Sequence, residues 1–159
     1  VIAILTMFVG VIIALTQTDV KRMLAYSSIA HAGVLLIAVI ATNEQGIGGA
    51  MFYLLAYGVA TIGAFGVVSL VRDSTGEATH LSSWAGLGKR SPWVAGAFTI
   101  FLLSFAGIPL TAGFIGKFAV FEAGVAGGAG WLVVVAVIAS AAATPLTAAV
   151  DTWRPTAVS

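Results

Sequence analysis

Residues 92–125 read PWVAGAFTIFLLSFAGIPLTAGFIGKFAVFEAGV, and the charged side chains among them are Lys117 and Glu122. As one straight α-helix this stretch would be about 50 Å long, at 1.5 Å per residue. The hydrocarbon core of a bilayer is only about 30 Å thick. The stretch is therefore too long for one straight span and too short for two.

A weak point lies near the middle of the stretch, where Gly107 and Pro109 are followed by Gly113. Proline removes a backbone donor and clashes with the preceding helical turn, so a helix kinks or ends there. Interrupted helices at membrane depth are tolerated only where protein buries them or where they line a hydrated cavity, and they commonly mark transport sites. The sequence predicts a membrane helix that is broken near Gly107 and Pro109.

The composition of the whole chain agrees with a membrane protein. Of 159 residues, 60% are hydrophobic and 8% are charged, whereas a soluble domain has about a quarter charged residues. The net charge of +1 is too small for a nucleic-acid-binding protein. The absence of cysteine excludes disulfides, thiolate zinc sites and cysteine-held iron–sulfur clusters. Redox chemistry within this chain would therefore need a bound organic cofactor. We expect no metal site, no cofactor in this chain and no nucleic-acid partner.

Charged residues divide the chain into five long apolar segments that lack the period-two alternation of barrel strands. In lipid such segments should be α-helices, because every backbone polar group must be satisfied internally. We expect an all-α polytopic membrane domain over residues 1–150, followed by an atypical tail at 151–159. The expected spans are residues 1–18, 23–43, 46–71, 92–125 and 130–150. The chain begins inside an apolar segment, so we expect it to be a fragment of a longer protein.

The connectors 19–22 and 72–93 should lie on the same side of the membrane and carry five of the seven basic residues. The positive-inside rule makes that side cytoplasmic. Residues 72–93 also contain Trp84 and Trp93. This composition predicts an interfacial connector that aromatic rings anchor at the membrane surface.

Lys117 follows the predicted break and has no acidic residue within four positions on either side. A lysine inside a membrane is costly and is by default a functional hypothesis, since a desolvated ammonium can exchange a proton at accessible pH. The alternative is a lysine that extends its side chain to the far interface, because a straight helix would place Lys117 near its exit.

His31 is central in the second expected span, close to Ser27 and Ser28. An imidazole and two hydroxyl groups could form part of a hydrated polar path, or His31 could simply be hydrogen-bonded to a neighbouring helix. Both interpretations stay open. Tyr26, Tyr53, Tyr57 and Thr61 could support the same path, but belt or packing roles are favoured for each. For Glu122 an interfacial carboxylate is favoured over a relay member, and for His80 a solvated surface role is favoured over metal binding.

Three motifs resemble one known family. Residues 17–33, QTDVKRMLAYSSIAHAG, resemble the signature of the antiporter-like subunits of respiratory complex I. LLAYG at 54–58 with GAF at 63–65, and LSFAGIPLTAGFIGKF at 103–118, are similar to the subunit N branch of bacterial NADH–quinone oxidoreductase. The sister subunit M usually carries glutamate where Lys117 stands. The resemblance covers about residues 1–140, and one hypothesis for residues 143–159 is a frameshifted or misassembled end.

The resemblance implies one five-helix inverted repeat whose broken fourth helix carries the key lysine. It implies that Lys117 belongs to a chain of protonatable groups coupling quinone reduction to proton pumping, with His31 in support. The chain would then be a translocase subunit without its own redox site. NADH, flavin, iron–sulfur clusters and quinone would belong to other parts of the complex. Its partners would be other membrane subunits and the lipid of the bacterial plasma (inner) membrane. The alternatives are a subunit of a multi-subunit cation/proton antiporter and an inert membrane scaffold.

Overall fold

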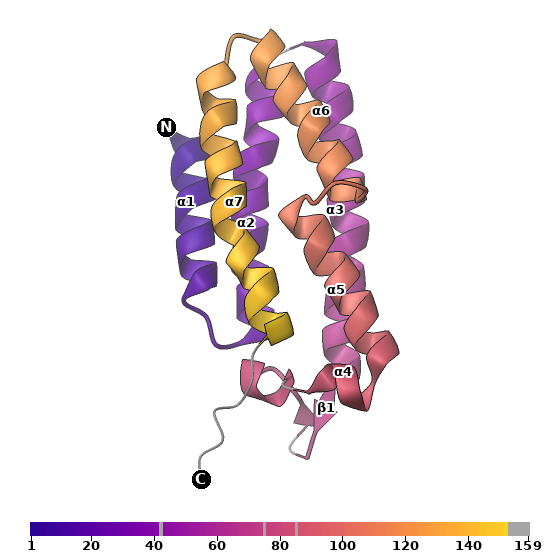
Figure 1. Ribbon diagram of the computed structural model, residues 1–159. Helices are drawn as coiled ribbons and strands as arrows, with labels where there is room; N and C mark the ends of the chain where they lie inside the picture. Colours follow the sequence, from indigo (N-terminus) through magenta and orange to yellow (C-terminus); the bar gives the residue numbers. More distant parts are fainter. Residues whose placement is uncertain (42, 75, 85, 153–159) are drawn as a thin grey trace.

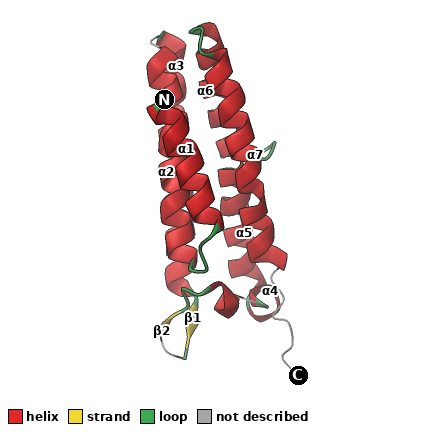
Figure 2. Cartoon of the chain, turned by 90° about the vertical axis from the view of Figure 1, so that its left-hand side faces the viewer, coloured by secondary structure: helices red, strands yellow, loops and turns green. Residues whose placement is uncertain are grey.

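The computed structural model describes residues 1–41, 43–74, 76–84 and 86–152. The long helices run side by side as an elongated bundle, with the small elements gathered at one end (Figures 1 and 2). The helices are α1 (Ile2–Leu15), α2 (Val20–Ala41), α3 (Glu44–Leu70), α4 (Leu87–Arg90), α5 (Pro92–Ala106), α6 (Ala112–Ala126) and α7 (Gly130–Thr152), with a 3-10 turn η1 at Leu81–Trp84. A two-stranded hairpin consists of β1 (Arg72–Asp73) and β2 (Gly76–Glu77).

The long helices form two groups, α1 with α7 and α3 with α5 and α6; α2 contacts both groups, and α7 also packs on α5 and α6. Helix α1 packs on α2 and α7, while α3 packs on α5 along one part of its length and on α6 along another. Helices α5 and α6 therefore follow one another along α3 (Figure 1). Within the described residues, two helical segments are long and apolar enough to cross a membrane alone, Val20–Ala41 and Gly46–Leu70. The segments Ile2–Leu15, Pro92–Ala106 and Gly130–Ala143 are apolar but shorter.

The connection between α5 and α6 lies within the range in which the sequence predicts an interruption. Gly107 ends α5 in the left-handed conformation, with φ +75°, and its N–H donates to the carbonyls of Leu103 and Ser104. Thr111 caps α6, because its hydroxyl oxygen accepts from the N–H of Phe114 at 3.3 Å. A left-handed glycine at one helix end and a threonine cap at the next are the usual way to stop and restart a helix.

The start of α2 differs from the sequence expectation. The sequence places Lys21 and Arg22 in a connector, whereas the helix begins at Val20 and includes both residues in its first turn. The Asp19 carboxylate accepts from the Arg22 N–H at 3.1 Å and so satisfies one of the free donors of the first turn. Basic residues are compatible with a helix start when a carboxylate caps it.

The connector that the sequence places at residues 72–93 contains regular structure, namely the hairpin, η1 and α4. Its hairpin pairs Arg72 with Glu77, and its next residues dock on the start of α2, where the Val20 N–H donates to the Thr79 carbonyl at 2.7 Å. Lys21 forms an ion pair with Glu77. These contacts hold the connector against the end of α2.

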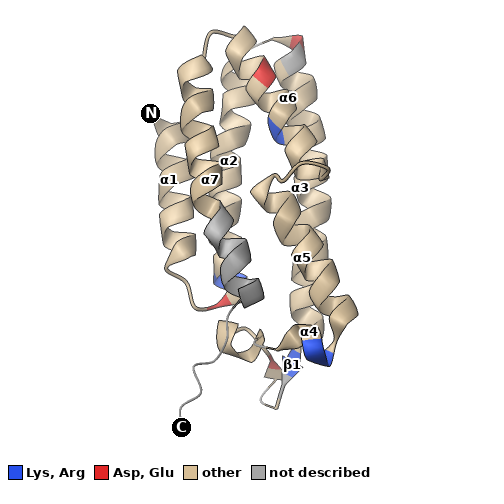
Figure 3. Ribbon diagram, in the orientation of Figure 1, with Lys and Arg blue, Asp and Glu red and all other residues tan. Residues whose placement is uncertain are grey.

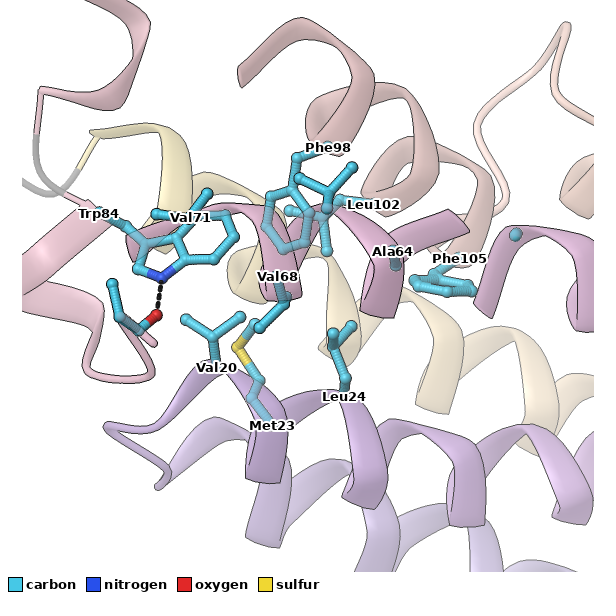
Figure 4. Packing of buried hydrophobic residues seen from close by; sticks show 13 residues of the cluster. Val20, Met23, Leu24, Ala64, Val68, Val71, Trp84, Phe98, Leu102 and Phe105 are labelled. Carbon is cyan, nitrogen blue, oxygen red and sulfur yellow. Dashed lines mark hydrogen bonds between the residues drawn. The ribbon is translucent and has the colours of Figure 1, made fainter. Parts of the chain in front are cut away.

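The connector also closes a hydrophobic core (Figure 4). Trp84 is 3% exposed, lies against Phe98 with ring centroids 4.5 Å apart, and donates its indole N–H to the Ala78 carbonyl at 2.7 Å. The expectation that Trp84 anchors the connector at the membrane surface is therefore wrong, since its ring is covered by protein. Trp93, in contrast, is 90% exposed.

A second core fills the opposite half of the bundle between α1, α2, α3, α6 and α7. Its fully covered side chains include Met7, Ile37, Tyr53 and Val120. The two cores meet around His31 and Phe105, since Tyr57 and Phe105 belong to the first cluster and Tyr53 to the second. The polar groups of the candidate site thus lie where the two cores join.

Candidate functional site

Lys117 lies inside the bundle and is 6% exposed. Its ammonium donates to the carbonyls of Phe105 at 2.8 Å and Ala106 at 3.3 Å. These carbonyls belong to the last turn of α5, where backbone oxygens lack helical partners and the helix dipole favours a cation. Because the side chain reaches back toward the break, this geometry does not agree with a lysine extended to the far interface.

Gly107 leaves room for Lys117, and Gly113 allows the close approach of α6 to the end of α5. A Cβ on Gly107 would lie 2.9 Å from Cδ of Lys117 and 3.2 Å from its Nζ. A Cβ on Gly113 would lie 1.8 Å from the Ser104 carbonyl oxygen, and the Gly113 N–H donates to the Ser104 hydroxyl at 3.2 Å. Pro109 is exposed in the connection and contributes through its effect on the backbone.

His31 lies on α2 and is 8% exposed. Its Nδ1 is hydrogen-bonded to the hydroxyl of Tyr53, a residue that is 1% exposed. The imidazole also packs on the Tyr57 ring at a centroid distance of 4.5 Å and on the Phe105 ring at 5.8 Å. The Tyr57 hydroxyl in turn donates to the Ser28 hydroxyl at 2.9 Å. His31 is thus part of a polar cluster contributed by α2 and α3.

A small cavity connects the two predicted site residues. It has a volume of about 30 Å³ and is lined by both His31 and Lys117, together with apolar side chains such as Met7, Val11 and Phe105. A second cavity of about 40 Å³ is lined by Ser27, His31, Leu102 and Phe105. One water needs about 10–15 Å³ measured in this way, so each cavity can hold one or more waters. His31 lines both cavities, whereas Lys117 lines the first.

The other charged residues of the described chain lie toward the two ends of the bundle, as the coloured parts of the ribbon show (Figure 3). The hairpin, α4 and the start of α2 carry the basic residues of one end, and Glu44 and Glu122 lie exposed near the other. Lys117 is the basic residue of α6, between these ends. His80 is exposed beside the hairpin. In the described part of the chain, no three His, Cys, Asp or Glu side chains are placed to hold a metal ion.

Sequence reasoning considered Tyr53 and Tyr57 as possible support for the polar path of His31 but favoured belt or packing roles, and it did not single out Phe105. The structure brings all three against His31. One signal was available, because two tyrosines four residues apart lie on one face of a helix. The carbonyl oxygens that hold Lys117 carry no signal in the side-chain sequence.

A family model described as NADH:quinone oxidoreductase/Mrp antiporter, transmembrane, matches residues 1–143. The chain belongs to this family. It is accordingly an integral membrane protein with an antiporter-like helical fold.

Relatives in the NADH:quinone oxidoreductase/Mrp antiporter family are similar over most of the chain. NADH-quinone oxidoreductase subunit N 3 of Streptomyces griseus is 66% identical over 142 residues, which are 89% of this chain and 26% of that protein. NADH-quinone oxidoreductase subunit N of Salinispora arenicola is 64% identical over 140 residues, 88% of this chain and 27% of that protein. The chain thus spans about a quarter of the length of these relatives.

Solved structures from the same family share the fold. The respiratory complex I of Thermus thermophilus with bound aureothin matches with a TM-score of 0.82 at 36% identity, covering 93% of this chain and 33% of the matched chain. The Mrp complex of Dietzia sp. matches with a TM-score of 0.84 at 27% identity, covering 94% of this chain and 28% of the matched chain. The fold is therefore common to both kinds of complex, while the more identical relatives are subunit N proteins.

Proposed function

We propose that the chain is part of a subunit N that translocates protons in the membrane arm of an NADH–quinone oxidoreductase, with Lys117 as the proton carrier. The observation that carries the proposal is a buried ammonium at a helix break that shares a cavity with an imidazole. The subunit N relatives and the similarity to a complex I chain support the same assignment.

The surroundings of Lys117 suit reversible protonation. Backbone carbonyls can only accept hydrogen bonds, so the end of α5 stabilises the protonated amine. No ion pair joins Lys117 to a carboxylate among the described residues. Its proton is therefore held by dipoles alone, and a positive charge that arrives nearby in a low-dielectric interior can favour release of the proton. A proton leaving Nζ can pass through water in the shared cavity to His31.

The proposed membrane arrangement has five spans, with α5 and α6 together forming one discontinuous crossing. The basic connector then lies on the cytoplasmic side of a bacterial plasma membrane, in keeping with the positive-inside rule. Redox groups and quinone belong to other subunits in this proposal, and this chain contributes proton transfer. Its partners are the neighbouring membrane subunits and the surrounding lipid.

A cation/proton antiporter subunit is the second candidate, and the similarity to the Mrp complex favours it. The identity to that chain is 27%, compared with 64–66% to the subunit N relatives. Cation-dependent proton exchange that continues without quinone reduction would favour the antiporter.

The test is Lys117→Ala in the full-length parent protein within its assembled complex. Proton pumping per electron should fall while assembly is kept, because alanine removes the carrier. Lys89→Ala is the matched control, since Lys89 is an exposed lysine at the end of α4. Unchanged pumping in a correctly assembled Lys117→Ala complex would refute the role of Lys117 and would leave a scaffold as the better interpretation.

A further inference from the structure

Tyr53 contacts both His31 and the helix that carries Lys117. Its hydroxyl is hydrogen-bonded to Nδ1 of His31 on α2. On its other side it lies against Gly116, the neighbour of Lys117 on α6. A Cβ on Gly116 would be 2.7 Å from Cδ2 of Tyr53 and 3.2 Å from its Cα. The Tyr53 ring is therefore fixed in place by close packing on the helix that carries Lys117.

The contact at Nδ1 has a chemical consequence for His31. A neutral imidazole carries one N–H, and the partner of one ring nitrogen determines which nitrogen is left to exchange a proton. With Nδ1 held by Tyr53, Nε2 is the nitrogen left for transfer through the cavity. For Nε2 to take up a proton, the neutral ring must carry its hydrogen on Nδ1, and the Tyr53 phenol oxygen can accept from that Nδ1–H in the neutral and in the charged ring. The same bond can therefore hold the ring in both protonation states.

We propose that Tyr53 is a positioning residue that fixes the tautomer and orientation of His31, so that Nε2 serves the cavity shared with Lys117. This inference rests on the proposed proton-transfer function. Tyr53 itself is not required to lose a proton.

Few titratable groups surround His31, and this limits which of them can cause a pH dependence of proton pumping. Its titratable neighbours are Tyr53 and Tyr57 on α3 and Lys117 on α6. Helix α5 contributes the Phe105 ring, and α1 and the described side chains of α7 contribute apolar groups and Ser140. A change in pH dependence caused by the Tyr53 hydroxyl therefore has to act through His31 or Lys117.

The experiment compares Tyr53→Phe with Tyr57→Phe in the full-length protein in its assembled complex. Each variant loses one hydroxyl and keeps its ring beside His31, but only Tyr53 is bonded to the imidazole; Tyr57 is bonded to Ser28. The measurement is proton pumping per electron across a pH series, with quinone reductase activity as the check on assembly.

We expect Tyr53→Phe to reduce pumping roughly two- to tenfold at the alkaline end, the effect of losing one neutral hydrogen bond. The defect should shrink toward acid pH, because a charged imidazole has N–H groups on both nitrogens and no tautomer to select. Tyr57→Phe should show no such pH dependence. In a His31→Gln background, Tyr53→Phe should add little, since the residue acts through His31.

A Tyr53→Phe defect of equal size at every pH, a defect matched by Tyr57→Phe, or one that adds fully to His31→Gln would each overturn the inference. Lys117→Ala, measured in parallel, separates this result from the proposed function. If Lys117→Ala abolishes pumping and Tyr53→Phe behaves as Tyr57→Phe, the positioning role alone fails. If Lys117→Ala has no effect, the proposed function fails.

Discussion

At the scale of single residues, the position of Lys117 depends on carbonyl groups without helical partners and on a glycine without a side chain. A buried ammonium needs acceptors, and α5 supplies two carbonyls because it ends at Ala106. These oxygens can be reached because Gly107 has no side chain on the face that Lys117 approaches. Gly107 therefore adopts the left-handed conformation that ends α5, and it also leaves space for the Lys117 side chain.

Gly107→Ala should disturb both features. At φ +75° an alanine is strained by about 1–2 kcal/mol, and its methyl group would press on Cδ and Nζ of Lys117. We expect lower thermal stability of the assembled complex and reduced pumping per electron. Gly96→Ala on α5 is the control, because a Cβ there meets nothing within 4 Å and alanine favours a helix. Equal pumping in the two variants would contradict the steric role of Gly107.

Single residues also show what the sequence can reveal. Lys117 was recognisable because a charge in an apolar stretch next to glycine and proline is unusual in lipid. The hydrogen-bond acceptors of Lys117 are main-chain oxygens. Which carbonyls lack a helical partner depends on the residue at which α5 ends, and the sequence does not fix that residue. The hydrogen bond between Tyr53 and His31 joins two helices. The spacing of Tyr53 and Tyr57 places both on one face of a helix, but it does not show that this face meets His31.

At the scale of elements, the junction of α5 and α6 is held by close backbone contact. Gly113, in the first turn of α6, lies so near the last turn of α5 that a Cβ would be 1.8 Å from the Ser104 carbonyl oxygen. A methyl group there has to displace backbone rather than a flexible side chain. The angle between the two helices therefore depends on this glycine.

Gly113→Ala should separate α5 from α6. Overpacking of a tight interior typically costs about 1–3 kcal/mol, and a backbone clash belongs at the upper end of that range or above it. We expect little assembled complex in the membrane, measured by its yield and its midpoint of thermal unfolding. Gly66→Ala on α3, where a Cβ meets nothing within 4 Å, should leave both quantities near wild type. Normal yield of Gly113→Ala would show that the junction tolerates displacement.

The elements differ in how far the sequence predicted them. The long helices follow from apolar length, and the weak point at Gly107 and Pro109 follows from backbone chemistry. The hairpin at residues 72–77 has strands of two residues, too short for an alternating pattern to appear. Its position depends on pairing with the start of α2, and the burial of Trp84 follows from that docking.

At the scale of the whole molecule, the charged residues of the described chain lie mainly at the two ends of the bundle, and among the described basic residues Lys117 lies between these ends (Figure 3). The connector end carries the described basic residues other than Lys117, and the opposite end carries Glu44 and Glu122. Two helical segments of the described residues are long and apolar enough to cross a membrane alone, so the proposed five-span arrangement rests on the shorter helices. The proposal that α5 and α6 make one crossing together can be tested by finding which ends share a side of the membrane.

Cysteine labelling of the full-length parent provides that test, since this segment contains no cysteine of its own. Single cysteines replace His80 in the connector, Glu44 at the start of α3 and Ala126 at the end of α6, all of them exposed positions. If α3 crosses once and α5 with α6 crosses once, a membrane-impermeant maleimide should label His80→Cys from the cytoplasmic side. It should label Glu44→Cys and Ala126→Cys from the opposite side. Labelling of Ala126→Cys from the same side as His80→Cys would mean that α5 and α6 enter and leave by one face, and the single broken crossing would have to be abandoned.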